Sequence, residues 1–453
     1  MRTYRRAGYV GVAALAVATL AAAGCSSSSS TSSASAAAPT SSNASAPAAP
    51  SSPVPTGSGQ GGLGTASVTN YLSYTGGTSG PANNSLPPVT VGFMNEQGDA
   101  NPPGLLSTNG AQMAVSYINK ELGGVDGHPL KLDTCFTTTE EQGTTCAQQF
   151  LANKAIPLVA TGGVAVGAQS FFSTLNGALP VIDGVAVTPF DAVQKNSVIL
   201  FGDATHVLGP IGNYAKNVLH AKTAAVIYPD TPGLLPGAQA IQAGLQAAGV
   251  SVTMEGYPAS ATNLTSVLAA AHASTADMVV PYADATDCVN LAKALVAQGI
   301  TDPTKIVSAP LCLSGTVIQA LGDFPKWTYS IASSLYGDPT DPGMPAYMAV
   351  ASKYTTPGNA PDPWEIVNFG EMLTVDKILN QVGYANIKPA TVLAAAKAFK
   401  GPQALGAPSL DCGAYSTAPG VCNDRAQFFE YQGKNKFTKV AGWLTPVSNP
   451  ATS

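Results

Sequence analysis

The chain has 453 residues, of which 45% are hydrophobic and only 10% are charged, with a formal net charge of -5. A chain of this length and apolar content has enough material for more than one packed domain. Because acidic side chains outnumber basic ones, the sequence offers no basic surface of the kind that neutralises phosphates, which excludes nucleic acid as a partner.

The first 24 residues have the pattern of a secretory signal peptide. Arg2, Arg5 and Arg6 precede an uncharged apolar run over residues 10–23 that ends in small residues. The run is marginal for a membrane-spanning helix, which needs about 20 apolar residues, and no stop-transfer flank follows it. Its removal leaves 18 basic against 26 acidic side chains, so the exported chain is more acidic still.

The signal ends in Leu-Ala-Ala-Ala-Gly-Cys at residues 20–25, which resembles the lipobox of bacterial lipoproteins. The resemblance implies that Cys25 is lipidated and that the protein is anchored to the outer face of the cytoplasmic membrane. The alternative is an ordinary cleaved signal with a free cysteine nearby.

The remaining cysteines form an even set. Six cysteines in an exported chain predict disulfide bonds, because the compartment is oxidising. Sequence proximity alone suggests that neighbours pair, as Cys135–Cys146, Cys288–Cys312 and Cys412–Cys422. No Cys-x-x-Cys pair occurs and the four histidines are scattered, so we expect no metal site. No cofactor is expected either.

Residues 25–87 contain no charged side chain and are rich in Ser, Ala, Pro, Thr and Gly. Such a composition cannot bury enough apolar surface to order itself, so we predict a disordered tether over this whole range. Residues 57–62 match the pattern G-x-G-x-x-G, but neither a strand before nor a helix after the motif is expected, and we treat it as a chance match.

From residue 88 onward, short β-branched runs alternate with Ala-rich helical runs, which is typical of parallel sheets covered by helices. The first unit has predicted strands at residues 89–93, 130–132, 157–160 and 179–182 and predicted helices at 110–122, 144–153 and 170–176. A second unit repeats the pattern. Its predicted helices cover 211–219, 236–248, 264–273 and 288–297, and its predicted strands cover 224–228, 251–255, 278–281 and 305–308. The prediction is therefore an α/β protein of two doubly wound lobes joined by a hinge.

Three stretches carry a family likeness. Residues 91–93 with 110–132, including Gly-Gly-Val-Asp-Gly-His-Pro-Leu at 123–130, strongly resemble the opening of the leucine/isoleucine/valine-binding protein family, which comprises type I periplasmic binding proteins of ABC transporters. Residues 224–299 resemble its second lobe. The pairs Gly401-Pro402 and Gly442-Trp443, with Cys412 and Cys422 between them, resemble the C-terminal tail of related lipoproteins.

The resemblance implies an N-terminal lobe from residues 88–206 and 327–400, a C-terminal lobe from 207–326 and 401–453, and three hinge crossings. It also implies a function. The protein would be a non-enzymatic, monomeric substrate-binding component of an ABC importer that delivers a branched-chain amino acid or a related small polar solute to a permease. The alternatives are a ligand-sensing receptor of the same fold and a secreted hydrolase, although neither G-x-S-x-G nor His-Glu-x-x-His occurs in the chain.

Ligands of open α/β sheets bind beyond the carboxyl ends of the strands, so we expect the binding residues in the loops that follow the strands. Gly162 and Gly163 offer backbone N–H groups to an anion, and Glu96 or Asp183 offers a carboxylate to an ammonium. The full candidate set is Glu96, Gly162, Gly163, Asp183, Thr188, Tyr282 and Asp284.

Each candidate also has a purely structural reading. Gly162 and Gly163 would then only turn the chain, Asp183 would cap a helix, and Tyr282 would pack in a core. In the family resembled, amino-acid binders have hydroxyl side chains in the loop that matches residues 163–166, where this chain has Gly-Val-Ala-Val. The departure leaves other small polar or aromatic acids, amides and urea-like solutes open as ligands.

Overall fold

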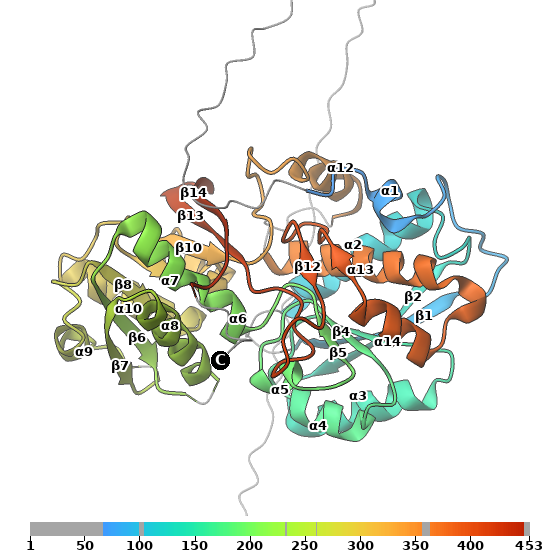
Figure 1. The fold of residues 1–453 in the computed structure, drawn as a ribbon, viewed down its shortest axis with the longest axis horizontal. Coiled ribbons are helices and arrows are strands. Elements are labelled where there is room, and N and C mark those ends of the chain that lie inside the picture. The colour runs from blue at the N-terminus through green and yellow to red at the C-terminus, as the bar shows by residue number, and fades with distance from the viewer. Residues whose placement is uncertain (1–66, 99–103, 232, 260, 356–362, 448–453) are drawn as a thin grey trace, which may run out of the picture. The chain divides into compact units, whose positions relative to one another are not determined.

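The computed structural model describes residues 67–98, 104–231, 233–259, 261–355 and 363–447. The predicted signal peptide, Cys25 and most of the predicted tether lie outside these ranges. Within them the chain builds two groups of strands, each with its own hydrophobic cores and covering helices (Figure 1). No helix in these ranges is both long enough and apolar enough to span a bilayer.

The first sheet is entirely parallel. Its strands are β1 (Val89–Glu96), β2 (Leu130–Thr137), β3 (Val159–Thr161), β4 (Val181–Asp183) and β5 (Ser197–Ile199), in the order β2-β1-β3-β4-β5. Successive side chains of a strand point to opposite faces. Accordingly Val91 and Phe93 lie in one core and Met94 in another. Both faces of this sheet are therefore buried, as is usual for parallel sheets.

Helices cover both faces of the first sheet. The core that contains Phe93 lies against α2 (Gly104–Glu121), α12 (Met344–Tyr354), α13 (Pro363–Val382) and α14 (Pro389–Lys397), and the core that contains Met94 lies against α3 (Glu140–Ala152) and α4 (Ala168–Leu175). The short helix α5 (Pro189–Ala192) follows β4. A Cβ atom on Gly110 of α2 would lie 2.3 Å from the Glu365 carbonyl oxygen of α13, so only glycine allows these two helices to pack so closely.

The second group has two sheets. One is the parallel sheet β7-β6-β8, built from β6 (Thr223–Pro229), β7 (Ser251–Tyr257) and β8 (Met278–Pro281). The other has the order β14-β13-β10-β9 and is built from β9 (Val307–Ser308), β10 (Thr328–Ile331), β13 (Ala426–Gly433) and β14 (Lys436–Leu444). A parallel bridge between Val279 and Ile306 links the two sheets.

The helices of the second group follow the predicted alternation with shifted ends. They are α6 (Ala204–Leu208), α7 (Pro210–Tyr214), η1 (Ala215–Leu219), α8 (Leu235–Ala247), α9 (Thr265–Ala270), α10 (Ala285–Ala297), η2 (Pro310–Cys312) and α11 (Gly315–Leu321). The predicted helix at residues 211–219 is thus an α-helical turn that continues as the π-helix η1. Ile227 and Val226, neighbours in β6, point into two different cores, so the parallel sheet is buried on both faces here as well.

Three segments connect the two strand groups, following β5, β10 and β12 (Leu410–Asp411). They are tied to one another by side-chain amides. The Asn423 amide donates to the Phe201 carbonyl oxygen at 3.0 Å, and the Gln427 amide donates to the Ser333 carbonyl oxygen at 2.8 Å. Three crossings are what the family resemblance implies.

The strand and core memberships differ from the predicted lobe bounds at two places. Residues 328–331, predicted in the N-terminal lobe, form β10 of the second group, because this strand pairs with β9 and β13. Residues 401–422, predicted in the C-terminal lobe, remain with the first group. Leu405, Leu410 and Cys422 are buried in the core of α2 and α13, and only β13 and β14 return to the second group.

Residues 67–87 also differ from prediction, since they are ordered and pack on the first group. They contain the helix α1 (Tyr71–Thr75), and the segment after it bonds to the end of α2 through Thr78 and Ala82. The Tyr74 hydroxyl shares a 2.9 Å hydrogen bond with the Thr374 hydroxyl of α13. Charge-free composition pointed to disorder, but aromatic side chains supply the apolar surface that holds this segment in place.

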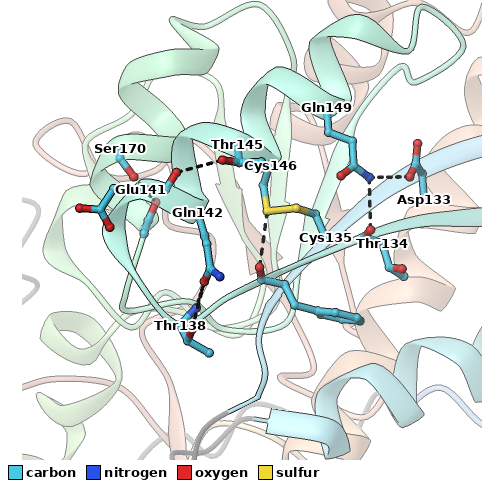
Figure 2. The surroundings of a disulfide bond; sticks show 12 residues. Asp133, Thr134, Cys135, Thr138, Glu141, Gln142, Thr145, Cys146, Gln149 and Ser170 are labelled. Atoms are coloured by element: carbon cyan, nitrogen blue, oxygen red, sulfur yellow. Dashed lines mark hydrogen bonds between the residues drawn. A yellow bond between two sulfur atoms is a disulfide. The ribbon is translucent and has the colours of Figure 1, made fainter. Parts of the chain in front are cut away.

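The three disulfide bonds join the pairs suggested by sequence proximity: Cys135–Cys146, Cys288–Cys312 and Cys412–Cys422. The first ties β2 to α3, as Figure 2 shows. Beside it the Gln149 amide donates to the Asp133 carboxylate at 2.8 Å and to the Thr134 carbonyl oxygen at 3.2 Å. Helix and strand are therefore held together covalently and by side-chain hydrogen bonds at the same edge.

We expect the substitution Tyr71→Ala to destabilise the protein. Tyr71 is 3% exposed, and its ring centroid lies 5.7 Å from that of Phe369 and 6.1 Å from that of Tyr117. Truncation of a buried aromatic side chain costs about 3 kcal/mol or more. Denaturant unfolding measures the loss. Ser73→Ala on the exposed face of α1 is the control and should change the unfolding free energy by less than about 0.5 kcal/mol. If Tyr71→Ala lowered the unfolding free energy no more than Ser73→Ala does, the packing of α1 against the first group would be contradicted.

Candidate functional site

The carboxyl ends of β1, β3 and β4 bring four of the predicted residues together. In the ladders Met94 pairs with Thr161, and Thr161 pairs with Asp183. Glu96 ends β1 and Gly162-Gly163 follows β3, so these residues lie at the same edge of the first sheet as Asp183. Sequence reasoning placed them in separate loops, and the parallel ladder gathers them because parallel strands end on one side.

Glu96 is used by the protein itself. Its side chain is only 3% exposed, and Oε2 accepts hydrogen bonds from the backbone N–H groups of Ala165 at 2.9 Å and Val166 at 3.0 Å. The next N–H group along the loop, that of Gly167, donates to Glu140 Oε1 at 3.0 Å. The loop after β3 is therefore held by two carboxylates of the chain.

Gly162 and Gly163 shape this loop. The Gly162 N–H group donates to the Met94 carbonyl oxygen at 2.8 Å, and its own carbonyl oxygen accepts from the Ser107 hydroxyl at 2.7 Å. A Cβ atom at Gly162 would lie 2.5 Å from Asn95 Oδ1. Gly163 has a φ of 89°, a conformation that other residues rarely adopt. The N–H group of Gly162 is therefore already bonded to the backbone of β1.

Asp183 is buried among other acids. Burial raises the pKa of its carboxyl group from 3.8 to about 7. Burial also raises the pKa values of Asp191 of α5 and Glu371 of α13 well above the ordinary range. The negative charge of nearby Asp183 adds to this effect on both carboxyl groups. We call Asp183, Asp191 and Glu371 the acid cluster.

Two members of the acid cluster were missed by sequence reasoning. Glu371 lies on α13, far along the chain from the strand ends, and its Oε1 accepts from the Thr161 N–H group at 3.3 Å. The available signal was a carboxylate within the otherwise apolar run Phe369 to Leu373. Asp191 follows the predicted Thr188 by three residues, a spacing that suggests helix capping but not burial.

Thr188 is half-buried and occupies the N-cap position that precedes α5. Its N–H group donates to Asp191 Oδ2 at 3.4 Å, so its backbone takes part in capping the helix. This hydrogen bond links Thr188 to Asp191 and so to the acid cluster.

The two predicted residues of the second group follow β8. Tyr282 is 4% exposed, burial raises the pKa of its hydroxyl to about 12, and it packs in the core beside α8, where Gly237 leaves room for its hydroxyl. Asp284 is exposed and caps α10, since its Oδ1 accepts from the N–H groups of Thr286 and Asp287 at 3.0 Å each. Nearby, Tyr257 at the end of β7 and Asp287 are buried, and burial followed by the charge of Asp287 raises the pKa of Tyr257.

A cavity of about 140 Å³ lies elsewhere, between α2 and the start of α13. It is lined by none of the predicted residues but by Asn109, Gln112, Met113, Ser116, Tyr354, Thr355 and Glu365. Over the described ranges, no group of histidine, cysteine or acidic residues is arranged to hold a metal ion.

The first strand group is a parallel sheet, and the second combines a parallel sheet with a mixed one; three segments cross between the two groups. This is the architecture of the type I binding-protein class. The family model described as periplasmic binding protein matches residues 88–418. The chain therefore belongs to the periplasmic binding protein family, which confirms the resemblance carried by residues 91–132. A search of curated proteins gave no match.

Solved structures of the same fold have different solutes in their descriptions. The branched-chain amino acid transporter substrate-binding protein LivJ from Streptococcus pneumoniae in complex with isoleucine is 16% identical, with 79% of this chain and 100% of that chain covered and a TM-score of 0.64. A solute-binding protein from R. palustris in complex with 4-hydroxybenzoate is 15% identical. The alignment covers 79% of this chain and 98% of that chain, with a TM-score of 0.61. A fatty acid ABC transporter substrate-binding protein from Thermomonospora curvata is 13% identical. The alignment covers 83% of this chain and 98% of that chain, with a TM-score of 0.62. At these identities the likeness establishes the fold alone.

The acid cluster predicts a pH-dependent stability. Asp183 keeps its proton in the folded protein up to a pH of about 7, whereas the unfolded chain releases it near 3.8. The folded state therefore binds more protons between these values, and its unfolding free energy should fall as the pH rises from about 4 to 7, by up to about 1.4 kcal/mol per pH unit for one proton. Denaturant unfolding at several pH values measures this slope.

Asp183→Asn should make the slope less steep, because the amide does not titrate, while Asp191 and Glu371 still bind protons in the folded state. The control is Asp302→Asn. Asp302 is exposed, and hydrogen bonding by the Thr304 hydroxyl holds the pKa of its carboxyl group below the ordinary value, so its removal should leave the slope over this range in place. A slope in Asp183→Asn identical to that of the unmodified protein would argue against a buried, protonated Asp183.

Proposed function

We propose that the protein is the extracytoplasmic substrate-binding component of an ABC importer that captures a small polar solute and delivers it to a membrane permease. The observation that carries this proposal is the family match over residues 88–418. The descriptions of the solved structures above add support, since they are of transporter substrate-binding proteins. The role is one of binding and release, and we expect no catalysed reaction.

Solute identity does not follow from the fold. Relatives of this fold are described with isoleucine and with 4-hydroxybenzoate, and one fold commonly serves different ligands. The candidates for contact with the solute are Glu96, Gly162, Gly163, Asp183 and Thr188 from the first group and Tyr282 and Asp284 from the second. The burial of Tyr282 and the capping bonds of Asp284 favour supporting roles for these two.

Capture would operate through the three connecting segments. A solute that binds the closed arrangement of the two lobes more tightly than the open one shifts the equilibrium toward closure, and a permease recognises the closed form. Hydrogen bonds such as those from Asn423 to Phe201 and from Gln427 to Ser333 hold the segments together, so we expect them to move as one hinge.

The same proposal includes export and anchoring. The signal peptide at residues 1–24, the lipid-accepting Cys25 and the charge-free segment that follows would keep a monomeric protein at the outer face of the cytoplasmic membrane. Three disulfide bonds agree with an oxidising compartment.

A cognate solute should raise the melting temperature of the purified protein, because any ligand that binds only the folded state stabilises it. At 100 times its dissociation constant the stabilisation is about 2.7 kcal/mol. A thermal-shift screen of amino acids, aromatic acids, amides, urea and polyols identifies the solute, and isothermal calorimetry measures its affinity.

Uptake of that solute by cells with and without the protein then tests the transport role. Loss of uptake supports the importer. Unchanged uptake with a measurable affinity would point instead to a ligand-sensing receptor. Chemical conversion of the solute only when the protein is present would point to an enzyme, and a melting temperature unmoved by every solute would contradict a binding function.

Cys25→Ser should release the exported protein from the membrane, since serine cannot form the thioether that carries the lipid. Fractionation of cells into membrane and soluble parts, followed by immunodetection, measures the change. The matched control is Ser26→Ala, which leaves the cysteine in place. A Cys25→Ser protein that has lost its signal peptide, as its mass would show, and still stays in the membrane fraction would rule out anchoring through Cys25.

A further inference from the structure

The Cys412–Cys422 disulfide bond differs from the other two bonds in its place in the fold. It closes residues 412–422, which we call the hinge loop and which lead from β12 into the third connecting segment at residues 423–425. Cys135–Cys146 lies within the first strand group and Cys288–Cys312 within the second. Of the three bonds in the described ranges, Cys412–Cys422 is therefore the one that borders a segment joining the two groups.

The hinge loop lies against β5, the strand that leads into the first connecting segment. The Ile199 N–H group donates to the Gly420 carbonyl oxygen at 2.7 Å, and the Cys422 N–H group donates to the Ile199 carbonyl oxygen at 3.0 Å. Ile199 and Val421 thus form a parallel bridge. The loop therefore continues the first sheet beyond β5, and two connecting segments leave the sheet from neighbouring positions.

The two connecting segments remain in contact after they leave the sheet. Asn423 follows the disulfide bond directly, and its side-chain amide donates to the Phe201 carbonyl oxygen at 3.0 Å. Gly202 has a φ of 92°, and a Cβ atom there would lie 2.6 Å from the Asn423 carbonyl oxygen. Their close approach therefore depends on glycine at this position, and a shift of one segment would displace the other.

The hinge loop also contacts the second group. Tyr415 is 6% exposed, and its ring centroid lies 4.8 Å from that of His206 in α6. His206 is held in place by Asp203 of the first connecting segment, whose Oδ1 lies 2.5 Å from Nδ1 and accepts from the His206 N–H group at 3.0 Å. The Tyr415 hydroxyl donates to the carboxylate of Asp424 in the third connecting segment. One loop of the first group therefore touches both connecting segments and the helix that follows the first of them.

The disulfide bond fixes the ends of this loop in the core of the first group. Cys412 is 6% exposed and Cys422 is 2% exposed, and both pack in the core of α2 and α13. Without the bond, hydrogen bonds to β5 would hold Cys422, and such bonds open more readily than a covalent link because water can replace them. The position of Tyr415 against His206 would then fluctuate more.

We infer that the Cys412–Cys422 disulfide bond positions the hinge: it holds the hinge loop so that the first and third connecting segments move together, and the affinity for the solute depends on it. The inference rests on the proposed function and deepens it. A loosened hinge populates arrangements of the two groups that do not bind the solute, and the apparent dissociation constant rises by the reciprocal of the competent fraction. A competent fraction of about one tenth would thus weaken binding about ten-fold.

The double substitution Cys412→Ser with Cys422→Ser removes the bond and tests the inference. The matched control is Cys135→Ser with Cys146→Ser. The sequence separations of the two bonds are 10 and 11 residues, so their loss relaxes the unfolded chain about equally. Denaturant unfolding should show similar losses of unfolding free energy for both variants, so that a difference between them at the hinge reports on position and not on overall stability.

Hydrogen exchange measured by mass spectrometry reports on the hinge without any solute. Peptides that cover residues 196–208 and 418–428 contain the N–H groups that join the hinge loop to β5. We expect loss of Cys412–Cys422 to speed their exchange at least ten-fold, and loss of the control bond to leave it unchanged, because local opening governs exchange in the native state. Equal exchange rates of these peptides in the two variants would overturn the inference.

Calorimetric titration tests the effect on affinity. The full-length mature protein and both variants are titrated with each amino acid, aromatic acid, amide or polyol that raises the melting temperature of the unmodified protein. We expect loss of Cys412–Cys422 to weaken binding at least five-fold and loss of the control bond to weaken it less than two-fold.

The outcomes separate the inference from the proposed function. Equal affinities of the two variants, or faster exchange with an unchanged affinity, would refute the dependence of binding on the bond and leave the binding function standing. A protein that binds none of these solutes would count against the proposed function, while the exchange rates would still decide whether the bond positions the hinge.

Tyr415→Ala is a second test that holds even if the cysteine variant does not fold. It keeps the disulfide bond and removes the contact with His206, so the same peptides should exchange faster and binding should weaken. Its control is Phe150→Ala, whose side chain is 1% exposed and lies in the core beside α4. If the hinge peptides of the Tyr415→Ala protein exchanged no faster than those of the Phe150→Ala protein, the role given to the hinge loop would be contradicted.

Discussion

Burial of both faces of the parallel sheets is the constraint from which the rest of the structure follows. Val91 and Phe93 point to one helical layer and Met94 to the other, so no side chain of β1 is free for solvent. Polar groups with a chemical role are thereby confined to the strand ends. The first sheet places Glu96, Gly162 and Asp183 at such an edge.

Burial of carboxyl groups at these strand ends disfavours their charged forms. Two features of the structure reduce this unfavourable effect. Glu96 remains bonded to the backbone of the loop after β3. Asp183 and Glu371 have raised pKa values because burial disfavours their charged forms. The same strand ends therefore hold buried carboxyl groups that favour their protonated forms, and each of these groups then carries an O–H donor as well as acceptor oxygens.

The path of the chain matters as much as its local pattern. α13 comes from a late part of the sequence, yet it completes the core of the first sheet and contributes Glu371 to the strand ends. Residues 401–422 remain with this core before β13 and β14 return to the second sheet group. The N-terminal segment with α1 packs on α13 as well, so one helix organises segments from three regions of the chain.

The sequence by itself determined the class of fold, the family and the central strands and helices, because alternation of β-branched and helical runs is a local property that survives in the folded state. It also singled out Glu96, Gly162 and Asp183, since strand ends can be located from the strands. Disulfide neighbours were suggested by proximity alone, and the structure joins the same pairs.

Only the tertiary structure decided what those residues contact. Glu371 reaches the strand ends by long-range packing, and Glu96 bonds to a loop some 70 residues further along the chain. The order of residues 67–87 depends on Tyr71 and Tyr74 finding a surface on α13. Composition can report how much apolar surface a segment has, but whether a complementary surface exists to bury it is a property of the assembled fold.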